Sequence, residues 1–157
     1  IKRMNHAVLY VRDAQRSADF YRDVLGFTTV VEFPGGSFLQ APDSTNDHDI
    51  AFFSIGDAAG PSTAGRGAVG LYHLAWEVGT LADLAEVGER LTEAGALVGA
   101  TDHGSTKSFY AKDPDGLEFE VCWVVPADLL GDTRQGMAPL DLPSELERYG
   151  AETVGGR

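Results

Sequence analysis

The sequence predicts an α+β domain in which two βαβββ modules form one cupped, partly closed mixed sheet around a central site, followed by a C-terminal tail. The first observation is an internal repeat, because the residue patterns of one half return in the same order in the other. Equivalent positions are 67, 69 and 71 residues apart in the pairs His6 and His73, Gly26 and Gly95, and Ser37 and Ser108. The second observation is that each half reads as strand, helix and three further strands. A repeat of about 70 residues is longer than solenoid repeats, so it indicates two fused modules of one domain.

The first module covers residues 4–55. Between residues 13 and 25, apolar residues recur at spacings of three and four, and Gly26 follows as a natural left-handed end of a helix. Short runs of β-branched, aromatic and aliphatic residues indicate the strands. In chain order these are residues 7–11, an extended segment ending at Val31, a segment starting at Ser37, and the apolar residues 49–55.

The second module covers residues 71–125 and follows a flexible linker of small residues at 56–70. An apolar stripe at residues 81–94, ended by Gly95, predicts its helix. Its last strand, residues 117–125, follows the turn sequence DPDG at 113–116, in which proline fixes φ and glycine accepts a positive φ. We therefore expect a single domain at residues 1–125.

Residues 126–157 form a C-terminal extension outside the repeat. It contains an apolar stretch at 127–130 and a helix pattern at 144–149, in which Ser144 would cap the helix with Glu147 at the third position. We expect this tail to lie over the open side of the cup or to mediate a dimer.

Composition limits the classes of function. The 157 residues are 43% hydrophobic and 23% charged, which suits one compact domain with a core. The formal net charge of −12 opposes binding to nucleic acid or to anionic membrane surfaces. The sequence shows no apolar run of membrane-spanning length, no signal-peptide pattern, and a single cysteine, Cys122, which cannot form an internal disulfide. We expect a cytoplasmic homo-oligomer, a dimer or higher.

Three candidate metal ligands lie in three separate strand patterns. His6 opens the run HAVLYV, His73 opens HLAWEV, and Glu120 lies within LEFEVCW. Two imidazoles and one carboxylate can hold one face of an octahedral ferrous ion and leave the other face open for substrate and dioxygen. A simpler alternative is that both histidines are half-buried strand residues satisfied by backbone carbonyls. Because side chains alternate along a strand, Glu120 shares a face with Glu118 and Cys122 and could instead face solvent.

These patterns resemble the vicinal oxygen chelate superfamily, which includes glyoxalases, bleomycin resistance proteins and dioxygenases. The resemblance rests on H-x-x-L-x-V in the first strand, H-L-A-W-E-V at the start of the second module, and the ending Y-x-K-D-P-D-G-x-x-x-E. It covers roughly residues 4–125 and is greatest to single-domain extradiol catechol dioxygenases. It implies a partial barrel of strands around a metal site.

The resemblance implies a role for all four histidines of the chain. The metal ligands fall on the two histidines and the glutamate named above, and an acid/base histidine falls on His48. The groups that contact the substrate oxygens fall on His103 and Tyr110. Each of these has a simpler alternative, since the histidines could be polar loop residues and the tyrosine a core aromatic.

The resemblance also implies how many protein ligands the metal has. Glyoxalase-like members use a fourth ligand from the last strand of the first module. Aligning residues 116–120 with residues 48–52 places Phe52 at that position, and phenylalanine cannot bind a metal. Three ligands would leave two open positions for the oxygens of a catechol and one for O₂.

The implied function is an Fe(II)-dependent extradiol dioxygenase, with Mn(II) as an alternative ion, that inserts both atoms of O₂ into a catechol-type aromatic diol. His48 would stabilise a negative oxygen and then donate a proton, while His103 and Tyr110 would hold the deprotonated diol. The aromatic ring would lie against an apolar wall formed by Phe38, Phe52 or Trp123. Two alternatives stay open: a metal-dependent glyoxalase-like lyase or isomerase, and a metal-free resistance-type protein that binds a small molecule.

Overall fold

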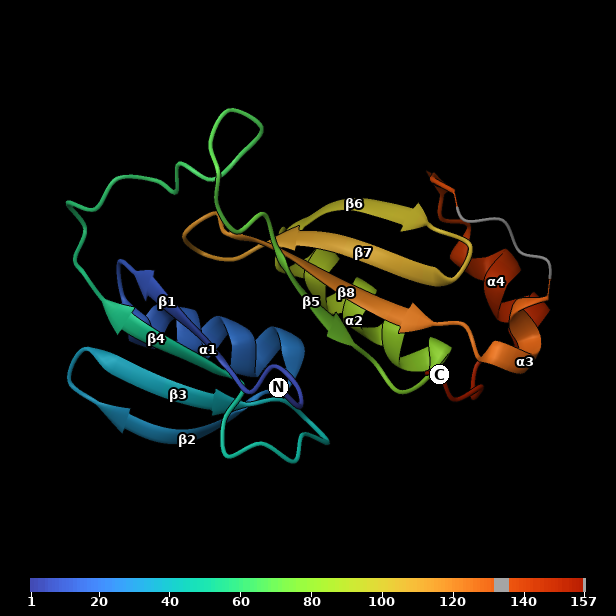
Figure 1. Ribbon diagram of the computed structural model, residues 1–157, viewed down its shortest axis with the longest axis horizontal. Helices are drawn as coiled ribbons and strands as arrows, with labels where there is room; N and C mark the ends of the chain where they lie inside the picture. The colour runs from blue at the N-terminus through green and yellow to red at the C-terminus, as the bar shows by residue number, and fades with distance from the viewer. Residues whose placement is uncertain (132–135, 157) are drawn as a thin grey trace. The chain divides into compact units, whose positions relative to one another are not determined.

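The computed structural model describes residues 1–131 and 136–156, which divide into two compact units (Figure 1). Unit 1 consists of Ile1–Thr63 with Asp113–Gly116, and unit 2 of Ala64–Lys112 with Leu117–Arg157. The change from one unit to the other after Thr63 falls inside the predicted linker 56–70. Module one is thus the main part of unit 1, and module two is the main part of unit 2. The end of a single domain at residue 125 stays a prediction.

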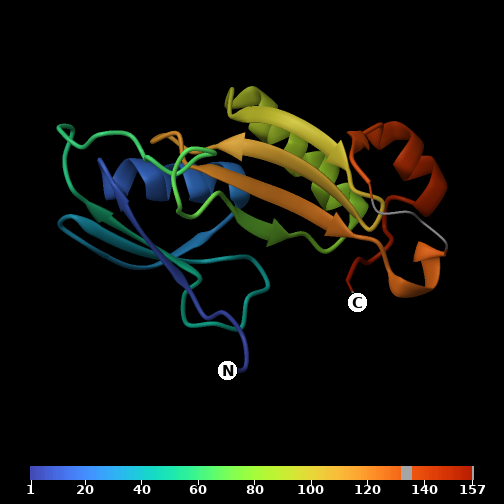
Figure 2. The same cartoon turned by 45° about the horizontal axis from the view of Figure 1, so that its top comes forward.

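Unit 1 contains a four-stranded sheet with one helix against it. Its elements are β1 (Ala7–Val11), α1 (Ala14–Leu25), β2 (Thr28–Phe33), β3 (Gly36–Gln40) and β4 (Ile50–Ser54). The strand order is β1-β4-β3-β2, in which β1 is parallel to β4 and the other neighbours are antiparallel. Figures 1 and 2 show α1 along one face of this sheet. The predicted order of strand, helix and three strands is confirmed.

The two ends of α1 show why this segment is helical. Asp13 is the N-cap, and its carboxylate accepts hydrogen bonds from the N–H of Gln15 at 2.9 Å and of Arg16 at 3.3 Å. At the other end Gly26 adopts a φ of 77°, and its N–H donates to the carbonyl of Arg22. The apolar stripe between these caps packs on the sheet and forms the core of unit 1.

Unit 2 repeats this arrangement and adds further elements. These are β5 (Leu74–Glu77), α2 (Leu81–Glu93), β6 (Leu97–Asp102), β7 (Thr106–Lys112), β8 (Glu118–Val124), α3 (Ala127–Leu130), β9 (Ala138–Pro139) and α4 (Leu142–Tyr149). The strand order is β5-β8-β7-β6-β9, in which β5 is parallel to β8 and the other neighbours are antiparallel. Thr80 caps α2 in a capping box with Asp83, and α2 covers one face of the sheet (Figure 2).

The strand register shows how closely the modules repeat. Val8 pairs with Ala51 on the β1–β4 ladder, as Ala75 pairs with Glu120 on the β5–β8 ladder. β2 and β6 carry a bulge at the same point, between Thr29 and Val31 and between Leu97 and Gly99. The α+β class and the two βαβββ modules are confirmed. Their strands form two separate sheets where one was expected, and neither sheet of the described residues closes on itself.

The register also corrects the pairing of Ser37 with Ser108. Ser37 lies opposite Phe52 on β4, and the corresponding pair in unit 2 is Phe109 opposite Val121. Ser37 therefore corresponds to Phe109, one residue beyond the position expected from sequence. A slip of one residue along a strand moves a side chain to the other face of the sheet, so this difference matters for the site.

One face of each sheet packs on its helix, and we call the other the helix-free face. The helix-covered faces hold the fully buried side chains Leu39, Ile50 and Phe52 in unit 1 and Phe119, Val121 and Trp123 in unit 2. Because residues alternate along a strand, the residues between these positions lie on the helix-free faces. The candidate site residues of the strands belong to this second set.

The DPDG turn folds as predicted and packs in unit 1. The Gly116 N–H donates to the carbonyl of Asp113 at 2.9 Å, and Gly116 has a φ of 81°. Arg12, just after β1, donates to the Asp115 carboxylate from its backbone N–H at 2.8 Å and from Nη1 at 2.7 Å. Arg12 Nη2 donates in addition to the carbonyl of Ala59 at 2.9 Å. These contacts explain why a turn from the second half of the chain belongs to unit 1.

The tail docks on unit 2 through buried polar contacts. Trp123 Nε1 donates to the carbonyl of Thr153 at 3.1 Å. The fully buried Lys107 places Nζ at 2.6 Å from Asp102 Oδ1 and at 3.0 Å from Glu145 Oε2 of α4. Since Lys107 lies on the helix-covered face of its sheet, α4 packs on that side. Of the two alternatives for the tail, a position over the open side is therefore wrong for α4, and a dimer contact stays a prediction.

Helix α4 also begins earlier than the sequence pattern suggested. Its N-cap is Asp141, whose carboxylate accepts from the Ser144 N–H at 3.3 Å and from the Ser144 hydroxyl at 2.8 Å. Pro143 lies in the first turn, where a backbone N–H has no partner inside the helix and its absence costs little. The predicted cap at Ser144 is wrong because the stronger acceptor lies three residues upstream.

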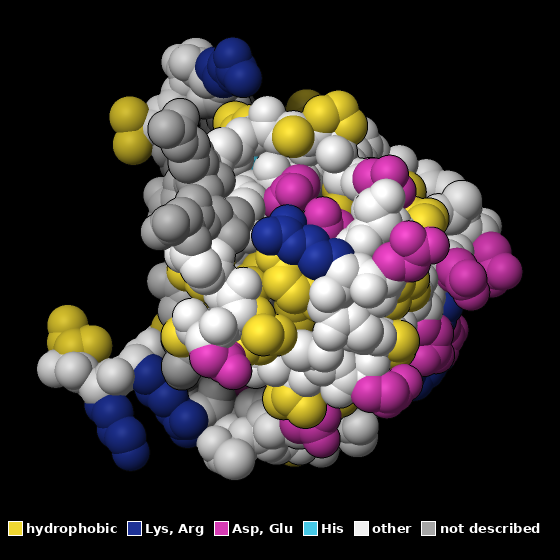
Figure 3. Space-filling model, turned by 90° about the vertical axis from the view of Figure 1, so that its right-hand side faces the viewer, with side chains coloured by type: hydrophobic (Ala, Val, Ile, Leu, Met, Phe, Trp, Pro, Cys, Tyr) yellow, Lys and Arg dark blue, Asp and Glu magenta, His cyan; other side chains and the backbone are white. Residues whose placement is uncertain are grey.

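The surface and the helix lengths fit the composition. Acidic side chains are spread over the side shown in Figure 3, with hydrophobic side chains between them, which agrees with the net charge of −12. In the described part of the chain, every helix is too short or too polar to cross a membrane.

Candidate active site

His73 and Glu120 meet in unit 2. His73 immediately precedes β5, and Glu120 lies in the middle of β8, which runs parallel beside β5. The His73 Nε2 atom lies 3.1 Å from Glu120 Oε2, and the two side chains are 22% and 12% exposed. The structure thus brings together two of the three predicted ligands. Their binding of a metal stays a prediction.

Glu120 does not lie on a solvated strand face. Its second oxygen, Oε1, accepts a hydrogen bond of 2.6 Å from the hydroxyl of Ser108, which is fully buried. The neighbouring Phe119 and Val121 occupy the helix-covered face and are 1% and 2% exposed. A largely buried carboxylate needs polar or charged partners to offset its lost hydration. Two such partners, Ser108 and His73, are in place.

Tyr110 and His103 form a second polar pair in the same unit. Tyr110 lies directly opposite Glu120 on the β7–β8 ladder, and its hydroxyl is 2.8 Å from His103 Nε2. His103 belongs to the tight β6–β7 turn, where the Gly104 N–H donates to the Asp102 carboxylate. Burial, together with the negative charge of Glu120, raises the pKa of Tyr110 to about 12. The phenol therefore keeps its proton at neutral pH and can donate it in a hydrogen bond.

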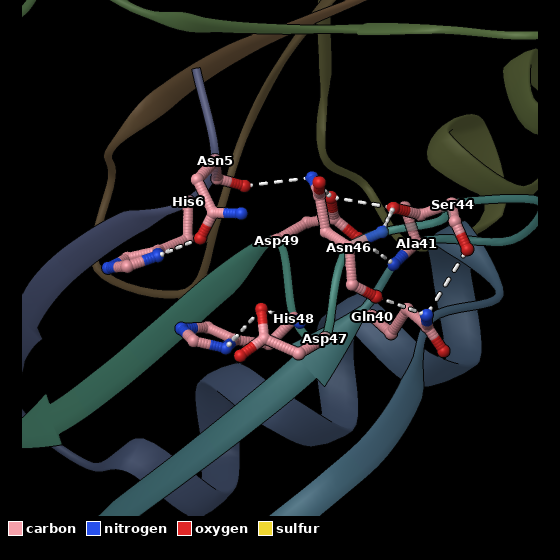
Figure 4. Close-up of polar contacts among 9 residues, drawn as sticks. All are labelled: Asn5, His6, Gln40, Ala41, Ser44, Asn46, Asp47, His48 and Asp49. Carbon is pink, nitrogen blue, oxygen red and sulfur yellow. Dashed lines mark hydrogen bonds and ion pairs between the residues drawn. The ribbon is translucent and has the colours of Figure 1, made fainter. Parts of the chain in front are cut away.

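His6 and His48 form a third group, which lies in unit 1 (Figure 4). Their ring centroids are 4.3 Å apart, and the ring of Phe38 meets His48 edge-on at 5.0 Å. His6 Nδ1 is 2.7 Å from Asn5 Oδ1, an oxygen that can only accept. The proton of a neutral His6 therefore sits on Nδ1, and the lone pair of Nε2 is left for a metal or another donor.

The residues fit a metal centre of the predicted type. The donor set of two imidazoles and a carboxylate suits a divalent iron or manganese ion, and Ser108 orients the carboxylate from behind. His73 Nδ1 is buried without a hydrogen-bond partner among the described residues. Within the described residues of either unit, no group of three His, Cys, Asp or Glu side chains gathers as a complete site. His6 belongs to unit 1, so its role as the third ligand stays a prediction.

The strand register shows that Ala51, and not Phe52, is the residue of module one that corresponds to Glu120. Glu120 pairs with Ala75, two residues after His73, and the residue that pairs with Val8, two residues after His6, is Ala51. Ala51 is fully buried and has no group that can bind a metal. The alignment of Phe52 with Glu120 was therefore wrong by one residue, and a metal without a fourth protein ligand stays a prediction.

Of the three residues proposed for the apolar wall, Phe38 alone lies on a helix-free face, and its role in a wall stays a prediction. Phe38 lies on the helix-free face beside His48, whereas Phe52 and Trp123 are fully buried on the helix-covered faces. Phe33 and Phe53 join Phe38 instead, with ring centroids 5.9 to 6.1 Å apart. Unit 1 thus presents three clustered phenylalanines near the His6 and His48 rings.

Sequence reasoning missed Ser108 and also Asn46, whose side-chain amide donates to the Asn5 carbonyl at 2.8 Å and to the Asp49 carboxylate at 2.6 Å. Ser108 lies two residues before Tyr110 in a strand, so alternation alone places both on one face and could have identified it. Asn46 lies in the irregular loop between β3 and β4, where no periodic pattern indicates its contacts.

Comparison with known proteins agrees with this architecture. The model of the Glyoxalase/Bleomycin resistance protein/Dioxygenase superfamily matches residues 3–121. The chain belongs to this superfamily. A solved superfamily domain from Frankia sp. EAN1pec superposes with a TM-score of 0.66 over 81% of this chain and 95% of that one, at 23% identity, and supports the fold.

Characterised members of the superfamily with different activities resemble the chain to a similar degree. It is 33% identical over 120 residues to biphenyl-2,3-diol 1,2-dioxygenase 3 of Rhodococcus globerulus, which is 76% of this chain and 62% of that enzyme. It is 30% identical to the lactoylglutathione lyase of Neisseria meningitidis serogroup A, in an alignment of 136 positions that covers 75% of this chain and 88% of that enzyme. The chain thus spans less than two thirds of the dioxygenase's length. These comparisons show the superfamily and leave the reaction to the chemistry of the site.

Proposed function

We propose that the protein is an Fe(II)-dependent extradiol dioxygenase that cleaves a catechol-type aromatic diol with both atoms of O₂. The observation that carries this proposal is the contrast between the two equivalent strand positions, Glu120 and Ala51. One module supplies a carboxylate beside a histidine, and the other supplies no further ligand. Such a set leaves room at the ion for two substrate oxygens and O₂. The dioxygenase from Rhodococcus adds support from sequence.

In this proposal His73, Glu120 and His6 hold the metal. A ferrous ion supplies a redox-active centre at which a diol and O₂ can meet, and Mn(II) is the alternative ion. Ser108 fixes the orientation of the Glu120 carboxylate through its 2.6 Å hydrogen bond. Asn5 fixes the His6 ring in the same manner through Nδ1.

The remaining polar groups handle the substrate and its protons. With the ring proton of His103 on Nε2, this residue donates to the phenol oxygen of Tyr110, and the Tyr110 O–H, which contacts the Glu120 carboxylate in this structure, can donate to a substrate oxygen once Glu120 holds a metal. His48 acts as the acid/base group, since imidazole changes charge near neutral pH. Its Nε2 atom is buried without a hydrogen-bond partner among the described residues, as expected of a group that awaits a substrate. Phe38 offers its ring as an apolar surface for the aromatic substrate.

A lyase or isomerase reaction is the second candidate. It is favoured by the Neisseria lactoylglutathione lyase, of which the match spans 88%. Such a reaction needs a Lewis-acid ion and no redox change, so it predicts activity with Zn(II), Ni(II) or Mg(II). The dioxygenase proposal predicts activity with Fe(II) or Mn(II) alone.

The test is an oxygen-consumption assay on protein purified and loaded with Fe(II) in the absence of oxygen. We expect a yellow ring-cleaved product, one O₂ consumed per catechol, and both atoms of ¹⁸O₂ in the product. Protein loaded with Zn(II) is the matched control and should be inactive. Binding of catechol without oxygen uptake in freshly loaded protein would refute the dioxygenase proposal, and turnover of a thiohemiacetal or an epoxide by the Zn(II) form would favour the second candidate.

The role of His48 is tested by His48→Asn. We expect this variant to bind iron and catechol as the wild type does, and to turn over more slowly by roughly the 10²–10⁴-fold typical of a lost general acid or base. An unchanged turnover number would remove His48 from the mechanism.

A further inference from the structure

A hydrogen-bond network in unit 1 joins the N-terminal segment to the loop between β3 and β4 (Figure 4). At its centre is Asp49, which is 8% exposed. Its carboxylate accepts three hydrogen bonds, from the Ala41 N–H at 2.8 Å, the Ser44 hydroxyl at 2.8 Å and the Asn46 side-chain amide at 2.6 Å. Three donors offset the hydration that this carboxylate loses on burial.

Asn46 extends this network across to β1. Its Nδ2 atom donates to Asp49 and also, at 2.8 Å, to the backbone carbonyl of Asn5, which belongs to the peptide bond just before His6. On the other side of His6, the Ala7 N–H donates to the carbonyl of Asp49 at 2.9 Å. The backbone of His6 is therefore held on both sides by the same loop.

The same loop also carries His48. The His48 N–H donates to the Asp47 carboxylate at 3.0 Å, and the Asp49 N–H donates to the carbonyl of Leu39 at 2.8 Å. His6 and His48 come from segments that are 42 residues apart in sequence, yet their ring centroids lie 4.3 Å apart, with the ring planes tilted by 31°. Asn46 links these segments beside His6 through its side chain, and a hydrogen bond of 3.2 Å from Arg3 Nη1 to Thr45 Oγ1 links them further along the N-terminal segment.

We propose that Asn46 is a positioning residue that sets the place of His6 relative to His48. It does so by fixing the Asn5 carbonyl to the Asp49 carboxylate with the two hydrogens of one amide group. The inference deepens the proposed function. It rests on that proposal only where it assigns His6 to the metal and His48 to proton transfer. The positioning itself belongs to the metal-free protein. A loop residue that only stabilises its own loop would not affect His6.

Ser44 provides the matched control. Its hydroxyl donates to Asp49 and accepts from the Asn46 N–H at 3.1 Å, so Ser44→Ala removes two hydrogen bonds from the same loop. Ser44→Ala leaves the contact between Asn46 and the Asn5 carbonyl in place. Asn46→Ala removes that contact. Asn46→Asp serves as a second variant of the same size, in which the donor amide is replaced by an acceptor.

The first measurement is NMR of the histidine ring signals in metal-free protein. We expect Asn46→Ala and Asn46→Asp to shift the ring signals of both His6 and His48, because the contact between the two rings changes. Ser44→Ala should leave the His6 signals in place. Equal shifts in the Ser44 and Asn46 variants, or an unshifted His6 in both Asn46 variants, would overturn the inference.

The second measurement is turnover of catechol by Fe(II)-loaded protein. We expect both Asn46 variants to lose roughly 10–100-fold in kcat, the range found for partners that orient a metal ligand, with a smaller change in KM. Ser44→Ala should keep kcat within about twofold of wild type at a similar melting temperature, a loss well below that range. Asn46 variants as active as Ser44→Ala would refute the positioning role. If the wild type cleaves no catechol, the proposed function fails, and the NMR experiment still decides the positioning.

Discussion

The helix-free faces of the two modules have the same backbone and different chemistry. In module two the pair at the centre of the β7–β8 ladder is Tyr110 and Glu120, and in module one the equivalent pair is Phe38 and Ala51. Both pairs lie in antiparallel ladders with a bulge at the same point of the neighbouring strand. Two side chains thus decide which module holds a carboxylate and a phenol and which one offers an apolar surface. The fold is repeated, and the chemistry is divided between the copies.

The helix-covered faces differ in another respect, because large and small residues exchange places. The eighth residue is Tyr21 in α1 and Gly88 in α2, and the strand positions on the same face are Ser37 and Phe109 respectively. A Cβ atom added to Gly88 would lie 2.5 Å from the Phe109 ring. Each module therefore fills its core by its own combination of a large and a small side chain. The helices are not interchangeable between modules.

Glu120→Ala gives β8 the residue that β4 has at the same position, and it should have the largest effect. We expect the metal affinity of the variant to fall by more than the ~10–100-fold typical for loss of a residue that only orients a ligand, because a direct ligand is gone. The fold should persist, since the carboxylate is not part of the core. Metal content after anaerobic loading, with circular dichroism, checks this. Glu118→Ala, on the same strand face, is the control and should keep its metal; full occupancy in Glu120→Ala would exclude Glu120 as a ligand.

Tyr110→Phe gives β7 an aromatic residue like the one at Phe38 and should have the next largest effect. Because burial and the charge of Glu120 raise the pKa of Tyr110 to about 12, the phenol is a hydrogen-bond donor throughout the neutral range. Loss of a hydrogen bond to a charged oxygen costs ~1.5–3 kcal/mol, or roughly a 10–150-fold decrease in kcat. Steady-state kinetics at unchanged iron content measure this. Tyr72→Phe, an exposed neighbour of His73, should change kcat little, and an equal loss in both variants would contradict the assignment.

Gly88→Ala tests whether the core of unit 2 needs a small residue in α2 opposite the large Phe109. The added methyl group overpacks against Phe109 at a cost of ~1–3 kcal/mol, which outweighs the gain of about 1 kcal/mol in helix propensity. We therefore expect a lower free energy of unfolding, measured by urea denaturation. Glu89→Ala, at the next and exposed position of α2, serves as control and should not destabilise. A stabilised Gly88→Ala would show that the Phe109 ring can move aside.

The smallest expected effect concerns the hairpin ends. The β2–β3 hairpin ends on the uncharged pair Phe33 and Gly36, and the β6–β7 hairpin ends on Asp102 and Lys107. Burial alone would raise the pKa of Asp102, but the Lys107 ammonium and the Gly104 N–H hold it below its ordinary value of 3.8. A lowered pKa contributes stability above pH 3.8 that is lost as the pH falls below it.

Asp102→Asn checks this dependence. The variant should lose less free energy of unfolding between pH 5 and pH 3 than the wild type, since it lacks a carboxylate that takes up a proton on unfolding. Urea denaturation at both pH values measures the difference. Parallel pH dependences in the two proteins would show that Asp102 does not contribute.

Local sequence patterns predicted the helices and strands well. They failed to predict which residues of the two modules correspond, because a shift of one residue in strand register changes the correspondence. Helix α1 ends at its C-cap Gly26, and α2 ends with its C-cap Ala94 just before Gly95. Both glycines adopt a positive φ that other residues avoid. The alignment of Glu120 with Phe52 failed because the loop before β4 is longer than the turn before β8, so counting back from a loop does not preserve register. The faces of the strands follow from alternation alone, but the partner of a given residue across the sheet does not.

The candidate site could be predicted in part. His73 and Glu120 meet because parallel pairing brings the start of β5 beside the centre of β8, and this pairing follows from the repeated strand patterns. The His6 and His48 rings come together where the hydrogen bonds of Asn46 join an irregular loop to the segment before β1. No periodicity marks such a residue, and only the three-dimensional contacts identify it.

The ion pair between Arg12 and Asp115 has a consequence for how the protein folds as it is made. The two residues are 103 positions apart, and both belong to unit 1. At a synthesis rate of about 5–20 residues per second, the Arg12 side chain leaves the ribosome roughly 5–20 s before its carboxylate partner. During that interval the end of β1 has no Asp115 to bind. The first half of the chain therefore completes its structure only after most of the second half has been synthesised, so the order of folding cannot simply follow the order of translation.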